Sequence, residues 1–310
     1  MMKRFLLLAA ALTVWSCADR MSPEETPVQD LSPDALYAQV ETCSKVSFDD
    51  ESGMYWNAAD SISAFFSPEN IKYIFDGATG DTEGSFSKAA DGAALSAAFS
   101  KIHALYPYRE DAACTDEGTI CTTLPARQSF TSGAFDPEAN IMVAVTSGTD
   151  DRSLSFKNVC GYLKVRLYGD NTIREIRFKG NNGEILSGQA EISCGYEDDP
   201  EIELSDGGEV MTLDCGEDGV SLPDSAAEAM DFWFILPPMT FQKGFTLEIE
   251  NTAGAVVTKG TTAEFPTTRN LIRKTKVMDI SSDPEFLSFS VTDKDGNTYD
   301  FNLIAPPGHV

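Results

Sequence analysis

The sequence predicts an all-β protein built from two antiparallel β-sandwich domains, and three observations lead to that prediction. First, about a dozen short segments carry apolar residues at alternate positions, the period of a half-buried strand. Second, Gly, Asn and Asp separate these segments, and such residues tolerate the positive φ of tight turns. Third, helical periodicity is weak, so a parallel sheet with crossover helices is not expected. A chain of 310 residues has room for two such domains.

Residues 1–16 are interpreted as a lipoprotein signal peptide. Lys3 and Arg4 precede an apolar block that is too short to span a bilayer as a permanent helix. Small or apolar residues ahead of Cys17 resemble the lipobox of bacterial lipoproteins, in which the cysteine becomes the lipidated N-terminus. Trp15 is bulky for that motif, and the alternative is an ordinary secretory peptide in which Cys17 is incidental. We predict lipidation at Cys17 and anchoring to the cell outer membrane on its exposed side.

Residues 17–34 are predicted to form a flexible tether between this anchor and the folded domains. The stretch is rich in proline, serine and acidic residues and lacks an apolar pattern. A segment of that composition has too little apolar surface to fold on its own.

The two domains are predicted to span residues 35–157 and 158–281. The strands expected in the first domain cover residues 36–41, 61–66, 72–77 and 141–147. The strands expected in the second domain cover residues 162–169, 173–180, 184–193, 209–214, 231–238, 245–251, 255–260 and 272–280. The best helix candidates are residues 92–102 and a short capped turn at 224–230.

Charge excludes one class of partner. Signal cleavage removes only Lys3 and Arg4, so 21 of the 23 basic residues remain against 49 acidic ones. A surface this acidic repels phosphate backbones and anionic headgroups, so no nucleic-acid partner is expected.

The cysteines and histidines do not predict a metal site or a cofactor. Six cysteines follow Cys17, none with CxxC spacing, and the only histidines are His103 and His309. Cys114 and Cys121 are placed to close a small acidic loop through a disulfide, whereas Cys160, in an apolar stretch, is expected to be a buried thiol. We predict neither a metal nor a cofactor.

Residues 282–310 are predicted to end the chain with a β-hairpin. Alternate apolar residues mark two strands on either side of a turn at Asp295–Gly296. The six residues expected to form a docking or donated surface are Leu287, Phe289, Val291, Tyr299, Phe301 and Leu303. A two-stranded ribbon is marginal alone, so the hairpin is expected to dock onto the second domain, begin a truncated module, or be donated to a partner.

Several motifs, in order, resemble the fimbrillin family. The stretch "LYAQVETCSKVSFDDESGMYWNAADSISAFF" resembles the family's opening, with Trp56, Asp60 and an apolar strand after them. The motifs "YIFDG", "ALYPY", "LPARQ", "IMVAV", "LSFKNVCGYLKVRLYG", "IREIRFKGNNGEILSG" and "FWFILPP" follow, so that the resemblance covers residues 36–280. One departure is Ala59, where the family pattern has a glycine.

The resemblance implies two tandem transthyretin-like sandwiches and a role in type V pili of Bacteroidales-type bacteria. In such pili a lipidated precursor reaches the outer membrane, an arginine-specific protease removes the first strand, and a partner's strand fills the groove. An unfilled sheet edge with an apolar groove is a template for an extended peptide of matching alternation.

The positions of the arginines favour one role within a pilus. No arginine lies between Arg20 and Arg109, and Lys45 is the only basic residue just after the first strand. We therefore expect the chain to keep its first strand and its lipid, as an anchor, accessory or standalone surface protein. Its expected partners are the membrane, through the lipid, other pilus or surface proteins, and a host or glycan ligand.

Two other functional classes were weighed. A carbohydrate-binding surface lipoprotein for glycan capture is the alternative, with Trp56, Trp233 and the clusters "YPY" and "FWF" as its aromatic platform, although aromatic residues in alternating strands more often form a core. An enzyme is not predicted, because no nucleophile elbow, P-loop or GxGxxG motif occurs, and acid pairs such as Asp198 with Asp199 are typical of soluble loops.

Overall fold

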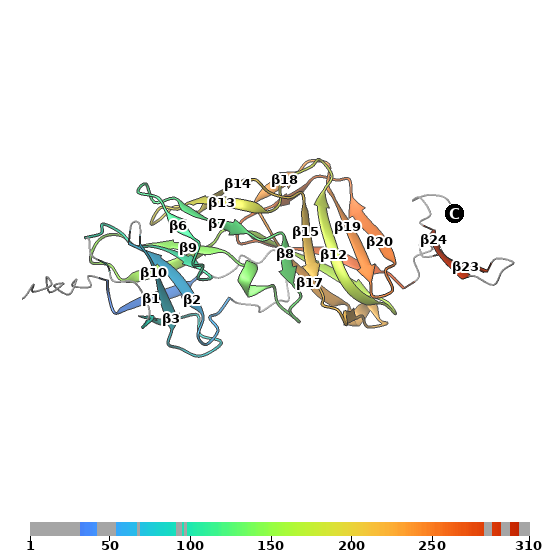
Figure 1. Cartoon of the computed structure of the whole chain (residues 1–310), viewed down its shortest axis with the longest axis horizontal. Coiled ribbons are helices and arrows are strands. Elements are labelled where there is room, and N and C mark those ends of the chain that lie inside the picture. Colours follow the sequence, from blue (N-terminus) through green and yellow to red (C-terminus); the bar gives the residue numbers. More distant parts are fainter. Residues whose placement is uncertain are drawn as a thin grey trace, which may run out of the picture.

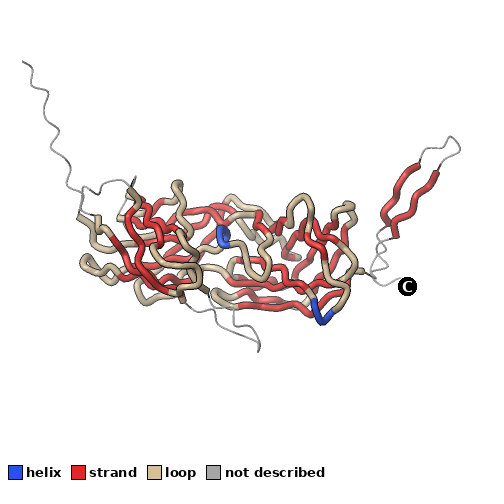
Figure 2. Tube along the Cα trace, turned by 90° about the horizontal axis from the view of Figure 1, so that it is seen from below, coloured by secondary structure: helices blue, strands red, loops and turns tan. Residues whose placement is uncertain are grey.

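The structure is a computed structural model that describes residues 32–41, 54–66, 69–90, 95, 98–281, 287–292 and 298–303. Within these residues it has 24 strands and two short 3₁₀ helices, η1 (Pro137–Ala139) and η2 (Ala226–Glu228). Strands run through the whole of the elongated body, and the two helical turns are minor (Figure 2). The prediction of an all-β fold is therefore confirmed. Across the described ranges, no helix has the length and apolar character needed to span a bilayer.

Seven strands of the first half form a closed barrel at one end of the molecule (Figure 1). In order around the barrel they are β1 (Ala35–Val40), β10 (Ser153–Asn158), β9 (Met142–Val145), β5 (His103–Tyr106), β2 (Ser61–Phe65), β3 (Asn70–Phe75) and β4 (Glu83–Lys88). Alternate residues point inward, as in β3, where Ile71, Tyr73 and Phe75 are buried and the residues between them are not. The inward residues enclose a core around the buried side chain of Trp56.

Two sheets built mainly from the second half share one core between their inner faces. One sheet has the order β17 (Met230–Leu236), β11 (Gly161–Tyr168) and β22 (Ile272–Asp279). The other has the order β20 (Val256–Thr261), β19 (Phe245–Asn251), β12 (Thr172–Gly180), β15 (Val210–Asp214) and β8 (Arg127–Ser129), with β16 (Val220–Ser221) beside β12. A small sheet pairs β18 (Met239–Phe241) with β21 (Phe265–Thr267). Phe178 from the second sheet and Phe234 from the first belong to the same buried cluster.

Backbone pairing joins the two halves across position 157. A four-stranded sheet has the order β14 (Glu201–Ser205), β13 (Gly188–Ser193), β7 (Ile120–Leu124) and β6 (Ala113–Cys114). In addition, β8 pairs in parallel with β15 of the second half. A third buried cluster lies at this junction and includes Phe65 and Leu105 from the barrel with Trp233 and Ile235 from β17. The halves are thus connected by hydrogen bonds and a shared core, not only by the covalent chain.

The expectation of purely antiparallel sheets is wrong in three places. Strand β1 pairs in parallel with β10, β11 in parallel with β22, and β8 in parallel with β15. The first sheet also closes into a barrel rather than remaining open. Alternation of apolar residues reports which face of a strand is buried and carries no information on the direction of its neighbour.

All twelve segments predicted as strands in the two domains contain strands, with ends shifted by a few residues. The capped turn at 224–230 is also confirmed, since η2 begins after Ser225, whose side chain accepts a hydrogen bond from the amide of Ala227. The helix predicted at 92–102 is not found in the described part of that stretch. Residues 95 and 98–102 are not helical, and Leu95 and Ile102 are buried in the barrel core.

The two C-terminal strands are present. β23 (Leu287–Thr292) and β24 (Thr298–Leu303) pair in the antiparallel direction, and the predicted turn at Asp295–Gly296 lies outside the described residues. The register pairs Leu287 with Leu303, Phe289 with Phe301, and Val291 with Tyr299. The six positions proposed as one apolar surface are therefore direct cross-strand partners. Both views draw the hairpin beyond the end of the second half, on the side where β20 lies (Figures 1 and 2).

The loop disulfide that the spacing of Cys114 and Cys121 would allow is not formed. Cys121 stands opposite Ala113, whereas Cys114 stands opposite Ile120, so the two thiols project from opposite faces of the β6–β7 ribbon. All five cysteines in the described residues are free thiols. Cys160 is buried, as predicted, and its burial raises its pKa to about 12.

We expect Cys160 to resist alkylation in the native protein. With a pKa of about 12, roughly 10⁻⁴ of the thiol is ionised at pH 8, and only the thiolate reacts at a useful rate. Iodoacetamide labelling followed by peptide mass spectrometry checks this, with guanidinium-unfolded protein as the control in which Cys160 should label fully. Rapid native labelling of Cys160, or a peptide linking Cys114 to Cys121, would contradict the arrangement.

Candidate functional site

Strand β1 is held along both of its edges. It pairs in the antiparallel direction with β4 over five residue pairs, from Ala35 opposite Ser87 to Gln39 opposite Glu83. On its other edge it pairs in parallel with β10, from Tyr37 opposite Ser153 to Val40 opposite Phe156. These two sets of hydrogen bonds close the barrel, because β4 and β10 are not paired with each other. The first strand is therefore the closing element of the sheet.

One face of β1 contributes to the barrel core. Leu36 and Ala38 are buried, Ala38 completely, whereas Tyr37 is 41% exposed and Gln39 is exposed. Ala38 stands opposite Gly84, and a Cβ at Gly84 would lie 2.8 Å from the ring of Phe75. The glycine thus lets an aromatic ring of the core pack against the β4 backbone beside the first strand.

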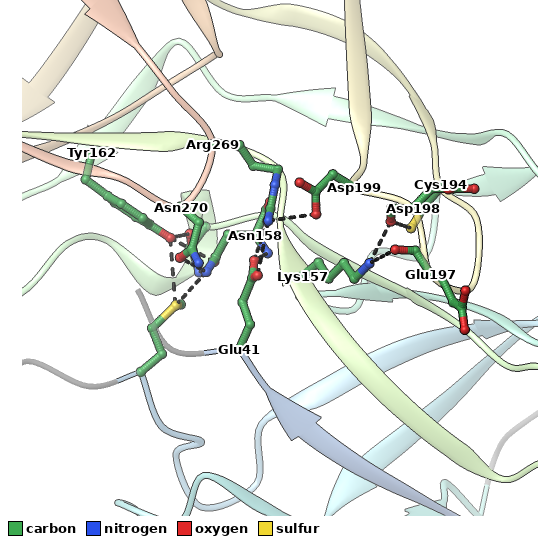
Figure 3. Close-up of polar contacts among 12 residues, drawn as sticks. Glu41, Lys157, Asn158, Tyr162, Cys194, Glu197, Asp198, Asp199, Arg269 and Asn270 are labelled. Atoms are coloured by element: carbon green, nitrogen blue, oxygen red, sulfur yellow. Dashed lines mark hydrogen bonds and ion pairs between the residues drawn. The ribbon is translucent and has the colours of Figure 1, made fainter. Parts of the chain in front are cut away.

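Glu41 follows β1 and connects the end of the strand to the second half of the chain (Figure 3). Its amide donates a hydrogen bond of 3.0 Å to the carbonyl of Phe156. Its carboxylate accepts hydrogen bonds from the amide of Asn158 and from both terminal nitrogens of Arg269. Arg269 Nη2 also pairs with Asp199 at 2.9 Å, and Nη1 donates to the carbonyl of Asn158 at 2.9 Å. We call Glu41, Arg269 and Asp199 the carboxylate clamp.

The guanidinium of the clamp is largely removed from solvent, with 17% of the Arg269 side chain exposed. Burial by itself lowers the pKa of Arg269, but the hydrogen bonds and charges of Glu41 and Asp199 outweigh it and hold the pKa above its usual value. A buried guanidinium is stabilised only while its carboxylate partners are in place. Loss of Glu41 would therefore leave Arg269 with one partly exposed carboxylate.

A buried network of amides continues from the clamp. Asn158 Nδ2 donates to Asn270 Oδ1 at 2.9 Å, and the hydroxyl of Tyr162 lies 2.8 Å from Oδ1 of both Asn158 and Asn140 (Figure 3). Asn270 adopts a φ of 56°, a conformation that asparagine tolerates better than most residues. These contacts link strands β10 and β11 to the loop before β22, so the end of β1 abuts a polar junction with a defined geometry.

Replacement of Glu41 by Gln is expected to lower the free energy of unfolding by about 1–2 kcal/mol, because a buried cation loses its closest charged partner while one hydrogen-bonding oxygen remains. Chemical denaturation followed by fluorescence measures the change. Glu197→Gln is the matched control, since Glu197 lies in the same region with an exposed side chain. Within the described residues, only its backbone carbonyl is bonded, to Lys157. Equal effects of both variants would show that the clamp contributes nothing specific.

The other residues that the sequence singled out lie either outside the described residues or in the buried cores. Cys17 and Lys45 lie outside the described residues. Trp56, Phe232, Trp233 and Phe234 are buried in the three cores, which confirms their interpretation as core and argues against an exposed platform built from them. No three His, Cys, Asp or Glu side chains in the described ranges converge as metal ligands would.

The sequence did not indicate the carboxylate clamp. Glu41 and Arg269 are 228 residues apart, and neither stands in a recognisable motif. The only sequence feature that pointed toward this site was the resemblance to the fimbrillin family, which marked the stretch beginning at residue 36 as the first strand. Nothing local identified its end as a contact with the second half.

No protein-family model matches the sequence, and no curated protein matches it. Solved structures do match. A candidate cell adhesion protein from Bacteroides ovatus is similar with 13% identity and a TM-score of 0.50, over 89% of this chain and 99% of that one. A candidate cell adhesion protein from Bacteroides uniformis has 14% identity and a TM-score of 0.48, over 86% and 96%. A fimbrial protein from Bacteroides ovatus has 11% identity and a TM-score of 0.34, over 86% and 53%.

These neighbours are described as candidate cell adhesion proteins and a fimbrial protein of Bacteroides species. At 13% identity the likeness to the first of them shows a shared fold, over nearly the full length of both chains.

Proposed function

We propose that the chain is a surface-exposed, lipid-anchored adhesion protein that serves as an anchor or accessory subunit of a pilus. It retains its first strand and acts through strand pairing and protein contacts, without bond-making chemistry. The candidate cell adhesion protein that shares its fold supports an adhesive role at the cell surface. The proposal keeps the predicted organisation of a tether, two transthyretin-like domains at 35–157 and 158–281, and a C-terminal hairpin.

The observation that carries the proposal is the double pairing of β1. The strand is bonded to β4 and β10, buries Leu36 and Ala38, and ends at Glu41 in the carboxylate clamp. Removing it would expose two strand edges and an apolar slot at once, which is the surface that another extended chain fills in strand addition. The clamp adds a charged contact that a replacement strand without an acid at that position would lack.

The sequence around the first strand supports retention over exchange. No arginine lies between Arg20 and Arg109, so an arginine-specific protease has no site between the first strand and the rest of the barrel. The first strand then stays in the folded body, and the lipid on Cys17 stays joined to it as long as the chain is not cut at Arg20 in the tether. That property suits a subunit that holds a fibre to the membrane.

The hairpin of β23 and β24 is the proposed contact with a partner. Its register places the six apolar positions opposite one another on two strands whose outer edges have no partner among the described residues. Such a ribbon gains stability by docking onto a sheet or joining one.

Mass spectrometry of the N-terminus, on protein extracted from the outer surface of the cell, tests the proposal. The expected result is an acylated Cys17 continuous with residues 18–45. A mature N-terminus at Val46, after cleavage at Lys45, would contradict retention and would indicate a shaft subunit instead. An unacylated N-terminus within residues 18–34 would contradict the anchor.

A further inference from the structure

A cavity of about 380 Å³ lies where the two halves of the chain meet. Its walls come from residues 54–57 before β2, from the loop between β8 and η1, and from strands β5, β9, β11, β17 and β22. The residues that line it include Tyr55, Tyr106, Phe135, Tyr162 and Trp233. Its volume is within the range of natural small-ligand sites, which is roughly 300–1,000 Å³.

None of the residues lining the cavity is charged, although charged residues make up 23% of the sequence. Five of the fourteen lining residues are aromatic. Phe135 stacks on Tyr162 with ring centroids 5.1 Å apart, and Tyr55 is 52% exposed. Such a site disfavours ions and accepts an uncharged molecule with an apolar face.

The cavity also has polar groups suited to a ligand with hydroxyls. Trp233 is 3% exposed, and its Nε1, although it has no acceptor among the described residues, is itself buried beyond the reach of a ligand in the cavity. The Tyr106 hydroxyl is already bonded to Asp60, and that of Tyr162 to the asparagine network. The side-chain amide of Asn140 is engaged in that network as well, which leaves the Asn57 side chain and the Thr131 hydroxyl as polar groups bordering the same space. A ligand that fits must therefore offer hydrogen-bond acceptors along with its apolar face.

We propose that this cavity binds a neutral sugar ring, at the end of a glycan. A pyranose carries an apolar face for the aromatic rings and hydroxyls for the Asn57 side chain and the Thr131 hydroxyl, whereas a purely apolar ligand leaves those groups unmatched. The site lies apart from the hairpin and does not require the first strand to be exchanged. It would let a surface adhesion protein hold a glycan as well as a protein partner.

Saturation-transfer NMR on the intact folded chain tests the proposal, with uncharged methyl glycosides of galactose, mannose, fucose and N-acetylglucosamine as probes and indole as the apolar comparison. We expect transfer to the ring protons of at least one glycoside. Ala134→Trp, which places an indole in the cavity wall, should weaken that binding by about tenfold or more, as should Tyr55→Ala at an exposed ring. Ala253→Trp, in an exposed turn of the second half, is the control that should bind unchanged.

Three outcomes would overturn the inference: no glycoside binds, only indole binds, or glycoside binding is equal in the Ala134→Trp and Ala253→Trp proteins. Because Tyr55→Ala alters an exposed side chain, a loss of binding in that variant with an unchanged melting temperature reports on the cavity and not on the fold. The outcome is independent of the N-terminal processing that tests the proposed function, so the two proposals can fail separately.

Discussion

Replacement of Ala38 by Asp is expected to destabilise the protein by about 4 kcal/mol or more, enough to unfold the barrel in a large share of molecules. Ala38 is completely buried in β1 and stands opposite Gly84, in a core lined by aromatic and aliphatic side chains. A carboxylate there has no cationic partner among the core residues. Equilibrium denaturation, followed by the fluorescence of Trp56 inside the same core, measures the loss.

Gln39→Asp is the matched control for that variant. It adds the same charge one position along the same strand, on the face that points to solvent, where it removes an exposed hydrogen bond to Ser155 and places a carboxylate opposite Glu83. We expect its effect to stay within about 1 kcal/mol. Equal destabilisation by the two substitutions would mean that β1 has no inward face, and the proposed role of the strand would fail with it.

Trp56→Ala is expected to cost about 3–5 kcal/mol, the usual loss when a large aromatic side chain leaves a filled core. Four rings surround the indole, with centroids 5.0 Å away for Phe86, 5.3 Å for Tyr106, 5.4 Å for Phe156 and 6.1 Å for Phe75. These rings come from β3, β4, β5 and β10, so one substitution loosens the packing of four strands of the barrel. Urea denaturation monitored by circular dichroism measures the loss.

Tyr55→Ala is the comparison for Trp56→Ala. The neighbouring tyrosine is half exposed and belongs to none of the buried clusters, so its removal should change the free energy of unfolding by less than about 1 kcal/mol. If the two variants unfold at the same urea concentration, Trp56 is not the centre of the core that the structure gives it.

The sequence predicts the strands with the clearest alternation and misses shorter ones. β12 was predicted because Ile176 and Phe178 alternate with charged residues along nine positions. β7 was missed because its five residues include two threonines and a cysteine, a composition that gives little contrast between faces. The difference arises because alternation is a statistical signal that needs length.

Long-range pairing is beyond what the sequence alone predicts. The neighbours of a strand depend on which edges meet after collapse, so the parallel pairing of β1 with β10 and the joining of β7 to β13 across the two halves have no local signature. The same holds for the clamp, where Glu41 meets Arg269 only once β1 is seated. Local chemistry predicted a strand at residues 36–41, and tertiary structure determined what lies at its end.

The central claim is that β1 is an integral closing strand of the barrel. Strand exchange in a cleaved protein tests this claim most directly. A specific protease site is introduced within residues 42–53, and the folded chain is cut there and then offered an excess of labelled peptide 32–41. We expect the N-terminal fragment to remain bound through gel filtration, to be replaced by the labelled peptide only under mildly denaturing conditions, and to resist replacement by a peptide carrying Ala38→Asp. The claim would be contradicted if the N-terminal fragment dissociated at once while the rest of the chain stayed folded with an unchanged melting temperature.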